Sequence, residues 1–201
     1  MASEEEKMLA GELYLASDPE LAARRAQARM LTRHYNASDP SARTQRRRLL
    51  VELLAAVGED VEIEPPFHCD YGSQIVVGSG VYVNVGAVVL DCARVEIGDR
   101  ALLGPGVHIY AATHPVNPGE RRSGRELAAP VRIGADVWLG GGVIVCPGVT
   151  IGAGTTIGAG SVVTRDVPPG VVAAGNPCRV LRAMDRPPHP AGDERALIKT
   201  T

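Results

Sequence analysis

The residue with the clearest capacity for chemistry is His114, which is followed directly by Pro115. A neutral imidazole, with a pKa of about 6.5, can take a proton from a hydroxyl group as that group attacks a carbonyl carbon. Proline disfavours helical backbone at the residue before it, so His114 is expected in an extended segment that restricts where its imidazole points. These features predict a general base at His114, and the alternative is an ordinary solvated histidine in a loop.

The elements that must position His114 follow a repeat of six residues. An α-helix keeps one face at about 3.6 residues and a strand at two, so neither produces this spacing, whereas a short strand plus a tight corner does. Hexapeptide repeats of this kind are typical of a parallel β-helix. The repeated aliphatic positions are Val77, Val83, Val89, Ile97, Leu103, Ile109, Ile133, Leu139, Val145, Ile151, Ile157 and Val163.

Glycine indicates that three strands make one coil. It follows the aliphatic residue at the first two corners of a set, as at Gly98 and Gly104, but not at the third, which is Tyr110. The cross-section is therefore expected to be a triangle with a narrow interior that holds small aliphatic side chains. An aromatic content of only 3% agrees with such an interior. The fold class is thus mainly β.

The repeat is interrupted once by a long polar segment. The interval from Ile109 to Ile133 is a multiple of six, so the coil can resume in phase after a protruding loop, residues 111–130, that carries His114. A long loop in a compact domain is usually functional or disordered. A smaller insertion of two residues is expected at a corner near residues 91–94.

The coil is expected to form one domain, residues 59–184, with additions at both ends. Residues 1–58 form a helical segment that packs on the coil, and residues 185–201 form a loose tail. The run Arg46–Arg48 is interpreted as the solvated face of a helix, since no aromatic residues are interleaved with it to suggest a nucleic-acid site. The expected helices are one over residues 3–15, one that starts at the cap Ser17 with Glu20 in the first turn, and one that ends at Gly58.

Composition excludes several classes of function. The net charge of −2 gives no general attraction to nucleic acid or to an anionic membrane. The sequence has no apolar segment near the roughly 20 residues of a membrane span. The four cysteines have no CxxC spacing, so free thiols in a reducing compartment are expected rather than disulfides or a zinc site. A cytoplasmic location follows as an expectation.

Four motifs carry a resemblance to a known family: Ala10–Tyr14, Cys69–Gly72, Val107–Pro115 and Ala174–Val180. Together with the coil they resemble the sugar O-acetyltransferases of the hexapeptide-repeat class, which include maltose, galactoside and nodulation-type acetyltransferases, with the maltose branch nearest. The resemblance implies a left-handed coil and a homotrimer with active sites between subunits. It also implies direct transfer of acetyl from acetyl-CoA to a hydroxyl of a sugar such as maltose or glucose. His114 would be the general base, and no metal is implied.

The resemblance assigns further roles residue by residue. Two departures from the family pattern concern acceptor binding: Ala16 stands where the family has Asp, and Cys92 stands where the galactoside branch has a carboxylate. Asp18 is a possible substitute for the first, and for Asp91 a capping role competes equally with acceptor binding. Substrate-binding roles fall on Asp70, Asn84 and Asp91. CoA-binding roles fall on Asn84, Gly141, Ala159, Thr164, Arg165, Arg179 and Arg182.

Several alternatives stay open at this point. The acceptor could be an antibiotic or another non-sugar hydroxyl. A zinc hydro-lyase of the carbonic anhydrase type shares the coil but needs three histidines on one ion, and only His68 adds to His108 and His114. A non-catalytic scaffold would leave His114 incidental. Trp138 should point outward, either onto the pantetheine arm of CoA or into a subunit interface.

Overall fold

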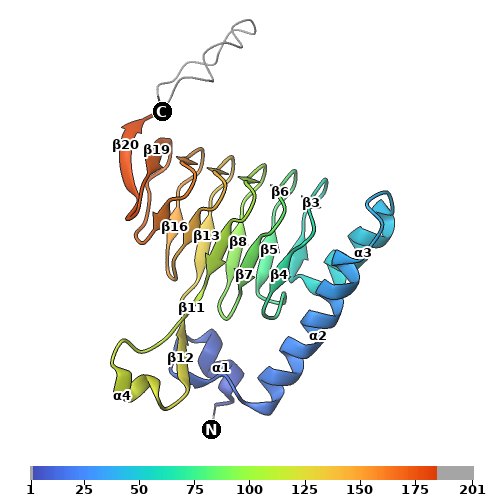
Figure 1. Ribbon diagram of the computed structural model, residues 1–201, viewed down its shortest axis with the longest axis vertical. Helices are drawn as coiled ribbons and strands as arrows, with labels where there is room; N and C mark the ends of the chain where they lie inside the picture. The colour runs from blue at the N-terminus through green and yellow to red at the C-terminus, as the bar shows by residue number, and fades with distance from the viewer. Residues whose placement is uncertain (1, 185–201) are drawn as a thin grey trace, which may run out of the picture.

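The computed structural model describes residues 2–184, which form a three-sided prism of parallel strands with a helical arm at the end formed by its first coil (Figure 1). The first sheet contains β2 (Ala56–Val57), β5 (Ile75–Val77), β8 (Val95–Ile97), β13 (Val131–Ile133) and β16 (Thr150–Ile151). The second contains β3 (Glu62–Ile63), β6 (Tyr82–Val83), β9 (Leu102–Leu103), β14 (Trp138–Leu139), β17 (Thr156–Ile157), β19 (Val171–Ala174) and β20 (Arg179–Ala183). The third contains β4 (His68–Cys69), β7 (Val88–Leu90), β10 (His108–Tyr110), β15 (Ile144–Val145) and β18 (Val162–Val163).

The strand register confirms the hexapeptide prediction. Val77, Ile97, Ile133 and Ile151 are consecutive register partners across the first sheet. Their side chains are at most 4% exposed, so they stack inside the prism. Equivalent columns run through the other two sheets, which gives three strands per coil and one aliphatic side chain from each strand in the core. Each fully buried Val, Leu or Ile contributes on the order of 1.5–3 kcal/mol.

The corner glycines are explained by the close stacking of successive coils. We call the corners first, second and third in chain order: first sheet to second, second to third, and third to first. A Cβ atom on Gly104, at the second corner, would lie 2.6 Å from the backbone nitrogen of Gly141 one coil away. A side chain there would push the coils apart. The third corner carries larger residues such as Cys146 and Thr164, and it is where the chain leaves the coil.

The N-terminal segment is helical, but its elements begin and end differently from the prediction. The first helix is shorter than expected, α1 (Glu4–Leu9), and the chain then forms the strand β1 (Tyr14–Leu15). The cap of α2 (Pro19–Asn36) is Asp18 rather than Ser17, because Asp18 Oδ1 accepts the N–H groups of Glu20 and Leu21. Helix α3 (Arg43–Leu53) ends at Leu54, so Gly58 is a corner residue of the coil and not its cap.

The interpretation of Arg46–Arg48 as a solvated face was wrong for Arg46. Its side chain is buried, and Nη2 donates to the hydroxyl of Tyr35 at 3.1 Å and to the carbonyl of Ile63 at 2.7 Å. Arg47 donates to the carbonyls of Val57 and Gly58. The carbonyls of Val57, Gly58 and Ile63 belong to the first coil, and the outer edge of this coil has no further coil to pair with. The two guanidinium groups thus cap the open end of the prism and protect its edge.

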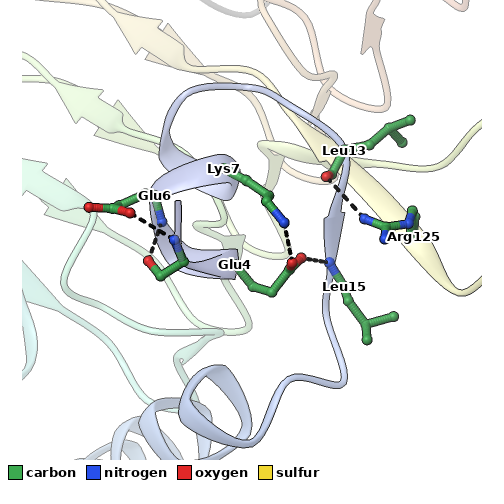
Figure 2. Close-up of polar contacts among 7 residues, drawn as sticks. Glu4, Glu6, Lys7, Leu13, Leu15 and Arg125 are labelled. Carbon is green, nitrogen blue, oxygen red and sulfur yellow. Dashed lines mark hydrogen bonds and ion pairs between the residues drawn. The ribbon is translucent and has the colours of Figure 1, made fainter. Parts of the chain in front are cut away.

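The protruding loop has structure of its own. It contains β11 (Ala112–Thr113), α4 (Pro118–Arg121) and β12 (Arg125–Ala128). Strand β12 pairs antiparallel with β11 on one side and with β1 on the other, which makes a small three-stranded sheet beside the prism. Figure 2 shows how β1 is held: Glu4 accepts the N–H of Leu15, and Arg125 donates to the carbonyl of Leu13.

The last described segment, residues 178–184, contains the strand β20. Of the helices within residues 2–184, none is long and apolar enough to span a lipid bilayer. The predicted tail, residues 185–201, lies outside the described residues.

Candidate active site

A cavity of about 310 Å³ lies where α2 and β12 meet the third corner of the first two coils. Its walls carry two carboxylates and two guanidinium groups, so it is suited to a ligand rich in hydroxyl groups. The lining residues are Ala16, Ser17, Arg25, Arg29, Asp70, Tyr71, Cys92 and Glu126.

Asp70 is the predicted acceptor residue that the cavity contains. Burial raises the pKa of its carboxyl group, and the Cys92 thiol together with Arg25 and Arg29 opposes that rise. The thiol donates to Asp70 Oδ2 at a sulfur–oxygen distance of 3.6 Å. Cys92 therefore lies where it can support Asp70, at the position where the resemblance led us to expect a second carboxylate in galactoside enzymes.

Arg25 fixes the wall that α2 contributes. Its Nη1 donates to the hydroxyl of Tyr71 and its Nη2 to the carbonyl of Ala16, each at 2.6 Å. Ala16 thus lines the cavity, although its side chain offers no polar group there. Asp18, the suggested substitute, uses its carboxylate to cap α2.

Asp91 is fully buried beneath the cavity wall. Its Oδ1 accepts the N–H groups of Asp70 at 3.1 Å and Tyr71 at 2.8 Å, and its Oδ2 accepts that of Gln74 at 3.2 Å. Burial raises its pKa to about 6 in spite of these bonds. The capping role left open by the sequence accounts for these contacts, and it shapes the corner that presents Asp70.

His114 directly follows β11, at the root of the protruding loop. Its side chain is exposed, whereas Pro115 is buried and holds the backbone of this turn against the protein. The other candidate in this region, His108, lies on β10, where Nδ1 is 2.6 Å from the hydroxyl of Tyr110. His114 is therefore the histidine that is both presented by the loop and open to a substrate.

Three of the residues expected to bind CoA lie at a different corner from Asp70. Asn84, Gly141 and Ala159 are at the second corner; one coil separates Asn84 from Gly141, and Gly141 and Ala159 are in adjacent coils, where Gly160 N donates to the carbonyl of Gly141. Asp70 and the root of the His114 loop are at the third corner, so the whole width of the third sheet separates the two groups within one chain. Thr164 and Arg165 are exposed at the third corner, and Arg179 and Arg182 are exposed on β20.

Trp138 points outward as predicted and is 51% exposed. It lies beside Leu102 in the second sheet, and Leu102 is 48% exposed. Among residues 2–184, no group of three or more His, Cys, Asp or Glu side chains is placed to hold a metal ion. A zinc centre therefore has no ligand set in the part of the chain that the structure describes.

Comparison with known proteins identifies the family. Residues 7–58 match a family model described as the maltose acetyltransferase hexapeptide capping motif, and residues 130–165 match the bacterial transferase hexapeptide model (six repeats). Nodulation protein L of Rhizobium meliloti (strain 1021) is 50% identical over 178 residues, which are 89% of this chain and 97% of that protein. The chain belongs to the hexapeptide-repeat acetyltransferases.

Solved structures of this family agree over nearly the whole length. A maltose O-acetyltransferase from Clostridium difficile 630 superposes with a TM-score of 0.90 at 44% identity, covering 92% of this chain and 99% of that one. A galactoside acetyltransferase in complex with coenzyme A has a TM-score of 0.89 at 40% identity, covering 92% of each chain. The predicted family is thus confirmed, and the prism is the left-handed parallel β-helix that the resemblance implied.

One residue of the cavity in this acetyltransferase was missed by the sequence analysis. Glu126 lies on β12 and accepts the hydroxyl of Tyr14, which is completely buried, at 2.9 Å. No sequence signal distinguishes Glu126 from the other charged residues of the loop. Glu126 contacts Tyr14 because β12 pairs with β1, and these two strands are more than 100 residues apart in the sequence.

Proposed function

We propose that this protein transfers the acetyl group of acetyl-CoA directly to a hydroxyl of a sugar such as maltose or glucose, with His114 as the general base. The observation that supports this proposal most is the cavity beside the His114 loop, in which the carboxylate of Asp70 offers an acceptor to sugar hydroxyls. Two solved relatives are named for sugars, a maltose O-acetyltransferase and a galactoside acetyltransferase, and the second is in complex with coenzyme A.

The reaction requires a general base for the sugar hydroxyl and a thioester carbonyl that is shielded from attack by water. His114 takes the proton of the sugar hydroxyl as its oxygen forms a bond to the thioester carbon, and the carbonyl becomes an oxyanion. The oxyanion then collapses, the carbon–sulfur bond breaks, and the CoA sulfur leaves with the proton held by His114. The products are the O-acetyl sugar and free CoA. General base catalysis of this kind contributes about 10²–10⁴-fold.

The separation of the two residue groups supports a site built from two subunits. Because Asp70 and His114 lie at the third corner and Gly141 and Ala159 at the second, one chain cannot place all of them around one acetyl group. A cyclic trimer brings the third corner of one subunit to the second corner of the next. The exposed Leu102 and Trp138 beside the second corner offer an apolar surface for that contact. CoA would then lie in the cleft between subunits.

Arg165, Arg179 and Arg182 would hold the phosphates of CoA in this arrangement. All three are exposed and are available to anionic groups. Guanidinium groups suit phosphates because they donate in a planar fork. Gly141 and Ala159 have no polar side-chain atoms, so they would contribute backbone groups and close approach only.

The test is release of the free CoA thiol from acetyl-CoA with maltose, glucose, a galactoside and chloramphenicol as separate acceptors. We expect release above the rate of hydrolysis with one or more of the sugars. Release with chloramphenicol alone would replace the sugar by an antibiotic acceptor, and release with none of them would refute the proposal.

His114→Ala tests the base, with His108→Ala as the matched control in the same part of the chain. Loss of about 10²-fold or more in kcat is expected for His114→Ala. An unchanged kcat in that variant would refute the role of His114 and would leave the transferase activity itself intact.

A further inference from the structure

We propose that Glu126 is a positioning residue for His114: its carboxylate accepts the N–H of the imidazole and turns the other ring nitrogen toward the acceptor hydroxyl. This inference rests on the proposed function, because it assigns a partner to the proposed base. It concerns a residue that the resemblance did not assign.

The register of the small sheet carries the argument. In the antiparallel pair of β11 and β12, Ala112 is opposite Ala128 and Thr113 is opposite Leu127. His114 directly follows the end of β11, and continuing the register by one residue beyond the strand would set it opposite Glu126. Residues directly opposite each other in an antiparallel pair project to the same face, with Cβ atoms about 4.5–5.5 Å apart. Glu126 faces the cavity, so its carboxylate lies on the face where the imidazole of His114 begins.

The carboxylate is already held from its other side. Strand β1 places Tyr14 opposite Glu126, and the Tyr14 hydroxyl donates to Glu126 Oε2 at 2.9 Å. The row across the sheet is therefore Tyr14, Glu126, His114. Oε1 of Glu126 accepts no hydrogen bond from the described residues, which leaves it available to the imidazole.

Hydrogen bonds from neighbouring segments hold β12, the strand that carries Glu126, and its partner β1 in place. Glu4 accepts the N–H of Leu15 and also the ammonium of Lys7, and Arg125 reaches the carbonyl of Leu13 (Figure 2). These contacts hold β1 on α1 and β12 on β1. Because β12 is anchored in this way, the carboxylate of Glu126 can fix the side chain of His114, which directly follows the short strand β11. A general base must be held in this way if it is to be aligned with the attacking hydroxyl.

The charges around Glu126 determine how the pair should respond to pH. Asp70 on the cavity wall is a like charge, and Arg25 and Arg29 from α2 are opposite charges. Cys92 and Tyr14 are neutral at physiological pH, because burial raises the pKa of each. The near neighbours thus carry a net charge of +1, which the carboxylate of Glu126 offsets. Without that carboxylate, an uncompensated positive charge would oppose the imidazolium that forms when His114 takes the proton.

The test compares Glu126→Gln with Glu120→Gln, an exposed glutamate of α4 in the same loop. Glutamine keeps the shape but removes the charge. In Glu126→Gln we expect kcat to fall about 10-fold with little change in the acceptor KM. The acid limb of the kcat/KM profile should move to lower pH, because the variant lacks the negative charge that favours protonation of the base. Glu120→Gln should match the wild type.

Tyr14→Phe is a second test variant, which keeps the buried aromatic ring. It removes the hydroxyl that anchors Glu126, so kcat should fall by a smaller factor while the acid limb stays near its wild-type position. An unshifted acid limb in Glu126→Gln, or a rise in acceptor KM without loss of kcat, would overturn the inference and make Glu126 a binding residue only. Those results are distinct from failure of the proposed function, in which the wild type itself releases no CoA with any acceptor.

Discussion

Mixed trimers test directly whether each active site is shared between two chains. We consider two variants, His114→Ala, which removes the proposed base at the third corner, and Ala159→Trp, which covers the exposed surface at the second corner where CoA is proposed to bind. Each variant alone should lose about 10²-fold or more in kcat. In the proposed trimer, each site takes His114 from one subunit and Ala159 from the next.

The recovered activity can be worked out from this geometry. When equal amounts of the two chains assemble at random, a site is intact only if its His114 comes from the Ala159→Trp chain and its CoA surface comes from the His114→Ala chain. Each condition is met about half the time, so about a quarter of the sites are intact. If instead one chain supplied both residues, every site would carry one defect and no activity would be recovered.

The assay is co-expression of the two variants, purification of the assembly and measurement of CoA thiol release per site. Size-exclusion chromatography of each preparation confirms that the variants still assemble. A mixed preparation no more active than its separate parents would refute the shared site, even if the protein is a trimer. Recovery near one quarter would place His114 and Ala159 on opposite sides of an interface between subunits.

Two further predictions concern stability. Arg46→Met should lower the free energy of unfolding by about 2–4 kcal/mol in urea titration, because two buried bonds from a charged donor are lost, whereas the exposed Arg48→Met should change it by less than about 0.5 kcal/mol. The pKa of Asp91 is raised from 3.8 to about 6 on folding, so the folded protein favours the protonated carboxyl group. The stability that this group contributes to the fold is therefore fully present below about pH 4 and is lost as the pH rises to about 6. Over that range the stability of the wild type relative to Asp91→Asn should fall by about 3 kcal/mol, and equal pH dependence of the two proteins would contradict the assignment.

The coil was predictable because its pattern is local and exact in period. Each strand places one aliphatic residue inside, so the columns through Ile133 and Leu139 could be derived by counting. The helix ends were less predictable, since Ser17 and Asp18 are both good caps and only the geometry of the chain decides between them. Arg46 was misjudged because its partners, the hydroxyl of Tyr35 and the carbonyl of Ile63, are not visible in the sequence of its own helix.

The site was predictable in part. Motifs mark His114 and Asp70 in the sequence, and the structure places both at the third corner, while their roles stay predictions. Glu126 was missed because its role comes from strand pairing with Tyr14, a contact between segments far apart in the chain. Sequence spacing reports what a residue does within its own element, whereas a cavity is made by several elements that meet.

The acceptor cavity can be traced to the insertion at the third corner. The coils from Val57 to Val77 and from Val77 to Ile97 are each two residues longer than the later coil from Ile133 to Ile151, although all of these residues are register partners. The extra residues must bulge outward, and a bulge leaves backbone N–H groups without partners. Buried Asp91 accepts three such groups, so the corner can bulge without leaving them unpaired. The cavity therefore lies where two successive coils each gain two residues and one buried carboxylate satisfies the backbone of the enlarged corner.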